Sequence, residues 1–144
     1  MGNRAVIVPI KTKRGYKNKV AIYLHWNGGR DSIEGFLTYC RLRGFRSPEN
    51  DSYGLARLAQ VIANYFHGGL SIGVDLAKRL DCDNRDNGVY LVKNWQIIKR
   101  DYFTGREQNE YKLLDMVKDI NSAQPKEEQI ENIEEKLNEL KSNS

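Results

Sequence analysis

The chain has 144 residues and a formal net charge of +4, with 40% hydrophobic and 29% charged residues. This is enough for one globular domain with a core and a short appendage. No apolar run approaches the roughly 18 residues that a membrane span needs, which argues against a membrane protein. Basic residues at position 4 and between positions 11 and 19 interrupt any signal-peptide core, so we expect a soluble, intracellular protein.

The charge is unevenly distributed along the chain. Three lysines and six glutamates lie from Pro125 onward, which gives the tail a net charge of −3 and leaves +7 for residues 1–124. A basic body favours an anionic partner such as a nucleotide, a nucleic acid or an acidic protein, and charge alone does not choose among them. The two cysteines, Cys40 and Cys82, and the two histidines show no metal-ligand spacing. We therefore expect no metal, no cofactor and a reduced cysteine pair.

The first half of the chain predicts two strands and two helices. Strands at residues 3–10 and 20–26 flank a basic hairpin tip, and Pro9 suggests an edge strand. Asp31 and Glu34 have the spacing of a capping box for a helix that ends at Gly44. A second helix is expected from Asp51 or Ser52 to about His67, followed by a short strand at 70–74.

The second half predicts two more strands, at 89–92 and 95–103, around a turn at positions 93 and 94. A short helix follows, with apolar residues between 111 and 120. We expect an α+β fold in which a small antiparallel sheet of four to five strands packs with two to three helices, within one domain at residues 1–122. Residues 125–144 should form an acidic amphipathic helix, since Ile130, Ile133, Leu137 and Leu140 step by three, four and three. A helix this short needs a partner surface, either its own body or a second copy, so homo-oligomers are expected.

A glycine turn at Gly28-Gly29 is the first candidate for a binding site. Trp26 offers a stacking face, Asn27 offers donors and acceptors, and Arg30 offers a cationic fork, which together suit a nucleotide. The alternative is a plain connection between strand and helix, with the tryptophan in the core and the arginine in solvent.

Two other segments allow a binding role and a structural one. In the loop at 80–88, Asn84 and Asn87 could read base edges or ribose hydroxyls, or they could stabilise a turn with Asx hydrogen bonds. A calcium loop does not fit, because Arg85 falls where an oxygen ligand belongs. The basic hairpin tip, which holds an aromatic Tyr16, could follow a phosphate backbone or only blunt the sheet edge. No catalytic motif appears, so we expect binding without turnover.

The sequence resembles the first-described family of phage Thoeris anti-defence proteins over about residues 2–121. The resemblance is carried by Gly2-Asn-Arg-Ala-Val-Ile, Ile22-Tyr-Leu-His-Trp-Asn-Gly-Gly-Arg-Asp-Ser-Ile-Glu-Gly-Phe-Leu, Tyr53-Gly-Leu-Ala-Arg-Leu-Ala-Gln-Val-Ile-Ala-Asn-Tyr-Phe66 and Asp83-Asn-Arg-Asp-Asn-Gly-Val-Tyr90. It implies a protein in the cytoplasm of the infected bacterial host that holds cyclic ADP-ribose isomers without cleaving them. Members of the family form dimers and assemblies of dimers, and some hold cyclic di- or trinucleotides at a separate site.

With such a ligand, Arg30, Arg43, Arg46 and Arg57 would contact the pyrophosphate, together with the Gly28-Gly29 turn. Trp26, Tyr90, Asn84 and Asn87 are the candidates for adenine. Two alternatives stay open: a phage inhibitor of the anti-CRISPR kind, which binds nucleic acid or a host nuclease, and a small phage enzyme that acts on nucleotides.

Overall fold

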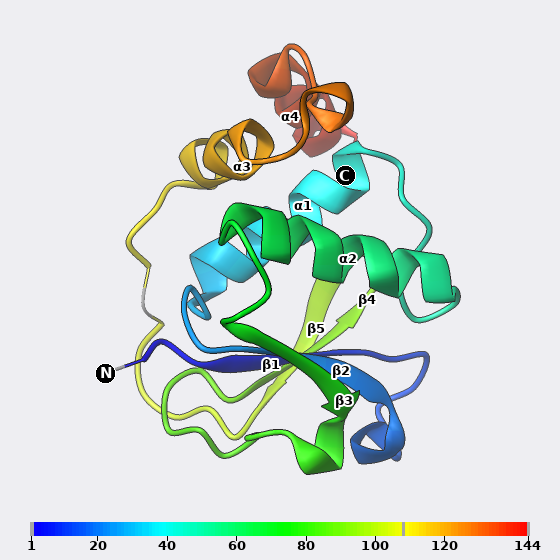
Figure 1. Ribbon diagram of the computed structural model, residues 1–144, viewed down its shortest axis with the longest axis vertical. Coiled ribbons are helices and arrows are strands. Elements are labelled where there is room, and N and C mark those ends of the chain that lie inside the picture. The colour runs from blue at the N-terminus through cyan, green and yellow to red at the C-terminus, as the bar shows by residue number, and fades with distance from the viewer. Residues whose placement is uncertain (1, 108, 144) are drawn as a thin grey trace.

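The computed structural model describes residues 2–107 and 109–143. These residues form one five-stranded sheet and four α-helices, which confirms the expected α+β fold. The helices stack on one side of the sheet (Figure 1). The strands are β1 (Ala5–Pro9), β2 (Val20–Leu24), β3 (Ile72–Leu76), β4 (Val89–Lys93) and β5 (Gln96–Asp101). The helices are α1 (Arg30–Leu42), α2 (Ser52–Tyr65), α3 (Leu113–Ser122) and α4 (Ile133–Ser142), and 3-10 turns occur at Tyr16–Asn18, Ala77–Arg79 and Lys126–Glu128.

β1 lies at the centre of the sheet, whose strand order is β3-β2-β1-β4-β5. Most neighbours are antiparallel, but β1 and β4 run parallel, with Val6 opposite Val89. The prediction that Pro9 marks an edge strand is therefore wrong. Proline is tolerated here because pairing of β1 with β2 ends at Ile7, so no partner on that side requires an N–H at position 9.

The two faces of the sheet are covered differently. The helix face carries the main core, to which the sheet contributes Ala5, Ile7, Ile22, Leu24, Tyr90 and Val92. On the opposite face a smaller apolar cluster lies beneath connecting segments rather than helices, and it contains Val6, Val8, Ile10, Ala21, Ala77, Cys82, Val89 and Leu91. Since β1 and β4 are buried on both faces, their sequences are continuous apolar runs instead of alternating ones.

The helix starts agree with the prediction for α2 and differ for α1. Asp51 caps α2, because its carboxylate accepts the N–H of Tyr53 at 2.7 Å. The N-cap of α1 is Gly29, so the capping-box prediction for Asp31 is wrong. Asp31 lies in the first turn of α1, where its carboxylate accepts the backbone N–H groups of Glu110 and Tyr111. It thus fastens the segment before α3 to the start of α1.

The turn between β4 and β5 is one residue later than expected. β4 extends through Lys93, and Asn94 and Trp95 both have positive φ values, 51° and 61°. This is the backbone of a tight hairpin turn, in which glycine is preferred. The Trp95 side chain is nevertheless buried in the main core, and its indole N–H donates to the carbonyl of Phe45 at 2.9 Å. These contacts offset the strain of the turn.

The C-terminal segment packs on the body of its own chain. Ile130, Ile133 and Leu137 are buried, and α4 contacts α1 and α3. The Tyr39 hydroxyl also donates to the carbonyl of Glu128 at 2.6 Å. The apolar seam predicted for this segment is thus used within one chain. Among the described residues, no helix is long and apolar enough to cross a membrane.

Candidate functional site

The backbone at the start of β1 packs directly against Gly28, in the glycine turn before α1. The N–H of Gly28 donates to the carbonyl of Asn3 at 2.8 Å, and a Cβ at this position would lie 2.6 Å from that oxygen. The Tyr90 hydroxyl donates to the carbonyl of Gly28 at 2.7 Å. The absence of a side chain at Gly28 therefore serves packing against the start of β1.

Trp26 and Asn27 line a small hollow beside this turn. Trp26 is 44% exposed and stands edge-on to His25, with 4.9 Å between the ring centroids. The Asn27 amide lies 3.3 Å from the Ser32 hydroxyl. The hollow has a volume of about 230 Å³ and is also lined by Asn3, Asp31, Ser32, Glu110 and Tyr111. Trp26 is thus not a core residue, and none of the predicted arginines lines this hollow with it.

Arg30 does not line the hollow that Trp26 and Asn27 line. Its Nε donates to the Glu34 carboxylate at 2.8 Å, one helical turn further along α1. It lines a separate hollow of about 250 Å³ that also includes Arg41 and Trp95. The fold therefore does not place Trp26, Asn27 and Arg30 around one hollow, as the sequence had suggested.

In the loop at 80–88, Asn84 and Asn87 form the hydrogen bonds of a turn, which was the structural alternative to ligand binding. The Asn84 side-chain oxygen accepts the N–H groups of Asp86, Asn87 and Gly88 at 2.9–3.1 Å. Both Asn84 and Asn87 are buried, and the Asn87 amide donates to the carbonyl of Arg4 at 3.1 Å. In this structure their side chains hold the loop together.

Tyr90 is also enclosed by the protein. Its ring is fully buried, and the guanidinium carbon of Arg100 lies 3.8 Å from the ring centroid. Burial raises the pKa of the Tyr90 phenol. Arg100 lies equally close to the ring of Phe103, at 3.9 Å, and forms an ion pair with Glu107. The Tyr90 ring therefore stacks on a side chain of its own chain and has no exposed face for an adenine.

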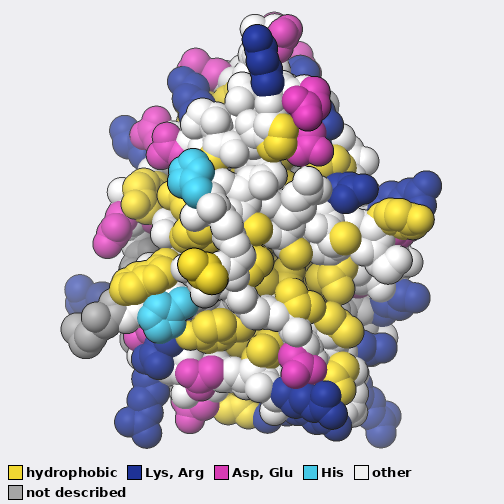
Figure 2. Space-filling model, viewed as in Figure 1, with side chains coloured by type: hydrophobic (Ala, Val, Ile, Leu, Met, Phe, Trp, Pro, Cys, Tyr) yellow, Lys and Arg dark blue, Asp and Glu magenta, His cyan; other side chains and the backbone are white. Residues whose placement is uncertain are grey.

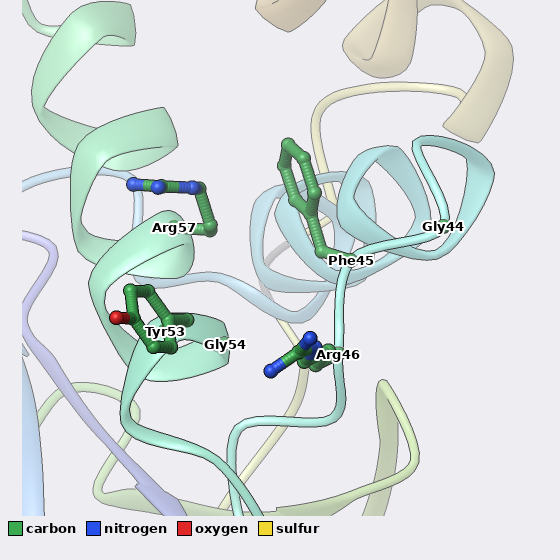
Figure 3. A pocket seen from close by; sticks show the side chains of 6 residues that line it. All are labelled: Gly44, Phe45, Arg46, Tyr53, Gly54 and Arg57. Carbon is green, nitrogen blue, oxygen red and sulfur yellow. The ribbon is translucent and has the colours of Figure 1, made fainter.

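Arg46 and Arg57 line one pocket, which we call the arginine pocket. It has a volume of about 570 Å³ and is lined by Gly44, Phe45, Arg46, Tyr53, Gly54 and Arg57. Figure 3 shows that Phe45 and Arg46 come from the loop after α1, while Tyr53 and Arg57 come from the first turns of α2.

Two glycines allow this loop and helix to approach each other. Gly44 has a φ of 72°, in the left-handed region that favours glycine, and it follows the end of α1. A Cβ on Gly54 would lie 2.1 Å from the carbonyl oxygen of Arg46. The loop therefore packs directly against the first turn of α2, and this contact sets the distance between Arg46 and Arg57.

The two guanidinium groups of the pocket have different partners. Arg46 forms an ion pair with Asp51 at 3.0 Å and lies over the Tyr53 ring, 5.9 Å from its centroid. The hydrogen bond from Arg46 lowers the pKa of Asp51. Arg57 donates to the neutral amide oxygen of Gln60 at 3.3 Å and has no carboxylate partner among the described residues. The pocket is therefore cationic, and Arg57 carries the uncompensated charge.

Arg43 does not line the pocket but contacts the ring of Phe45, which does. Its guanidinium carbon lies 5.5 Å from the centroid of Phe45, and its Nε is buried without a hydrogen-bond partner. Of the predicted arginines, the fold thus brings Arg46 and Arg57 to one pocket and places Arg43 against its Phe45. Sequence reasoning missed Phe45 and Tyr53. The spacing of four between Tyr53 and Arg57 on a predicted helix is the signal that would have placed both on one face.

Comparison of the chain with protein-family models, with curated proteins and with solved structures finds no match. The function is therefore inferred from the pocket geometry and from the sequence resemblance.

Proposed function

We propose that this protein binds cyclic ADP-ribose-type immune signals and sequesters them without cleavage, which would block Thoeris signalling. The observation that carries the proposal is the arginine pocket, where Arg46 and Arg57 face one hollow together with Tyr53. Homo-oligomers and additional binding of cyclic di- or trinucleotides belong to the same proposal, through the sequence resemblance.

The pocket chemistry suits a nucleotide pyrophosphate. Guanidinium groups bind phosphate oxygens through paired, charge-assisted hydrogen bonds, and two of them from separate elements can hold two phosphates. The Tyr53 ring is 64% exposed and offers a face for a base to stack on. The volume of about 570 Å³ falls in the usual range for small-molecule sites.

A sponge must also bind tightly. Capture of a signal at sub-micromolar concentration needs roughly −8 to −12 kcal/mol of binding free energy, which calls for a largely enclosed site. In a single chain the Arg46 side chain is 71% exposed. A second chain over the pocket would supply the enclosure.

The test is calorimetric titration of the protein with a cyclic ADP-ribose isomer. The ligand is then released by heat denaturation and identified by mass spectrometry. We expect sub-micromolar binding and recovery of the intact cyclic molecule. Arg57→Gln should weaken binding about 10- to 100-fold, the usual effect of losing one charged hydrogen bond. Arg14→Gln, which removes the same charge from the hairpin tip, should leave binding unchanged. No binding by the wild type, or a linear product, would refute the proposal.

A second candidate is an inhibitor that binds nucleic acid or a host nuclease. It is favoured by the hairpin tip, where Lys11, Lys13 and Arg14 are exposed, although Lys17 is engaged with the Tyr102 hydroxyl and ring. This function predicts strongly salt-dependent binding to DNA, RNA or the nuclease. Charge reversal at Lys13, Arg14 and Lys17 should abolish that binding, and the candidate fails if it has no effect.

A further inference from the structure

Two adjoining hollows on the surface share no lining residue with the arginine pocket. The first is the hollow of about 230 Å³ beside the glycine turn, which we call the Trp26 hollow. The second has about 400 Å³ and is lined by Asn27, by Tyr65, Phe66 and His67 at the end of α2, and by Asp119, Ser122 and Ala123 at the end of α3. We call it the helix-end hollow. Asn27 lines both hollows, so they meet at this residue.

The helix-end hollow has two sources of negative charge. α2 ends at Tyr65 and α3 ends at Ser122, and the C-terminus of a helix carries a partial negative charge. Gln124, just after α3, accepts a hydrogen bond from Asn64 of α2 at 2.9 Å, which holds the two helix ends together. The Asp119 carboxylate lies in the last turn of α3 and adds a full charge. A cation is therefore favoured in this hollow.

The Trp26 hollow is acidic as well. Asp31 and Glu110 line it, and Glu110 has no ion-pair partner among the described residues. The Tyr65 hydroxyl lies 3.4 Å from the Asn27 amide, where the hollows meet. Burial raises the pKa of the Tyr65 phenol, and Asp119 and Asp31, one from each hollow, raise it further. Among the described residues, no lysine or arginine lines either hollow, although the protein as a whole is basic.

Aromatic rings form part of both hollows. Trp26 is 44% exposed and Tyr111 is 40% exposed, and both line the Trp26 hollow, while Phe66 lines the helix-end hollow. Figure 2 shows hydrophobic and acidic side chains on the surface between the two histidines, of which His67 lines the helix-end hollow and His25 contacts Trp26. Aromatic faces beside carboxylates attract organic cations.

An organic cation fits these hollows better than a metal ion. Within residues 2–107 and 109–143, no group of three or more His, Cys, Asp or Glu side chains could hold a metal ion. Aromatic carbon offers no ligand to a hard cation, whereas its π face attracts ammonium groups. Since carboxylates lie in both hollows, a ligand that uses all of them carries several positive charges along one chain.

We propose that the two hollows together bind an aliphatic polyamine. One ammonium group lies at Asp119 and the two helix ends, another lies at Asp31 and Glu110, and the methylene chain passes Asn27. A lysine or arginine side chain of another protein carries a single charge at its tip and reaches one hollow, whereas a polyamine reaches both. The arginine pocket takes an anion on other residues, so this binding is separate from the proposed sequestration.

The first test is calorimetric titration of the full chain with spermidine, followed by NMR. We expect saturable binding of one spermidine per chain. The indole N–H signal of Trp26 should move on binding, and Trp26→Leu identifies that signal by removing it. The signal of Trp95 should stay in place, because this indole is buried and donates to the carbonyl of Phe45.

The second test uses matched variants. Asp119→Asn and Glu110→Gln should each weaken spermidine binding about three- to tenfold, the scale of a partly exposed ion pair. Asp83→Asn is the control, since Asp83 is exposed and lines neither hollow, and it should bind as the wild type does. Circular dichroism should show the same melting for all variants. Butylamine, with one ammonium group, should bind roughly tenfold more weakly or worse.

Four results would overturn the proposal. The first is no saturable binding of spermidine. The second is an equal loss of affinity in Asp83→Asn, which would show attraction to the whole surface. The third is the same movement of the Trp26 signal with Mg²⁺ at equal ionic strength, which would show a general counter-ion effect. The fourth is butylamine binding as tightly as spermidine, which would show that one hollow acts alone and that a protein's lysine could occupy it.

Discussion

The arginine pocket depends on the absence of a side chain at Gly54, which lets the loop pack against α2. The Cα of Gly54 faces the carbonyl of Arg46, and a methyl group there would lie 2.1 Å from that oxygen. Gly54→Ala must push the loop at 44–47 away from α2, which separates Arg46 from Arg57. We expect a loss of about 1–3 kcal/mol in the free energy of unfolding, as for other overpacked sites, and weaker ligand binding. Urea denaturation and titration measure the two effects.

Gly69→Ala is the control at the residue scale. No atom lies within 4 Å of a Cβ built at Gly69, and its φ is not in the left-handed region. This variant should keep the stability and binding of the wild type. If Gly54→Ala behaves the same way, the loop does not depend on close contact with the helix.

At the scale of the element, α2 depends on one carboxylate that serves two purposes. Asp51 caps the helix through Tyr53 and pairs with Arg46. Asp51→Ala should lower the urea midpoint more than Asp51→Ser, because serine is also a good N-cap. The pKa of Asp51 is lowered in the folded protein. Its contribution to stability is therefore present above the unfolded pKa of about 3.8 and is lost as the pH falls through the lower folded value.

The check is a series of urea titrations of the wild type and Asp51→Ala between pH 7 and pH 2.5. The gap between them should be widest near neutral pH and should narrow as the pH falls below about 4. A gap that does not change with pH would show that the charge of Asp51 contributes nothing beyond the cap.

The helices and strands were easier to predict than the way in which the strands pair. The strands, the end of α1 at Gly44 and the Asp51 cap follow from local residue types, so the sequence is sufficient for them. The parallel pairing of β1 with β4 joins strands far apart in the chain, and no local pattern encodes it. Trp95 has a left-handed backbone in a turn because its ring is needed in the core, so tertiary packing overrides the local preference for glycine.

The same distinction explains the candidate site. Arg46 and Arg57 could be chosen by residue type, but only the packing of Gly54 brings them to one hollow. Arg30 has a Glu at the spacing of four that forms ion pairs on helices, and this pairing was visible in the sequence. The side-chain amide of Asn84 could stabilise a turn or contact a ligand with the same atoms. The residue type alone therefore could not decide between these two roles.

At the scale of the whole molecule, α4 is part of the core. Leu137 is buried, whereas Leu140 on the same helix is only partly buried. Leu137→Ala should cost about 2–4 kcal/mol of unfolding free energy, and Leu140→Ala clearly less. Both variants should unfold in one transition, measured by circular dichroism and tryptophan fluorescence together. A separate, earlier transition for α4 would show instead that the helix is an independent appendage.

The central position of β1 has a consequence for how the protein is made. Val6 pairs with Val89, so β1 leaves the ribosome 83 residues before the strand that it pairs with. At typical rates of protein synthesis that delay is on the order of ten seconds. Until then β1 has only the hairpin with β2, which is marginally stable by itself. We therefore expect the nascent chain to hold this apolar strand without its β4 partner for more than half of the synthesis of these 144 residues.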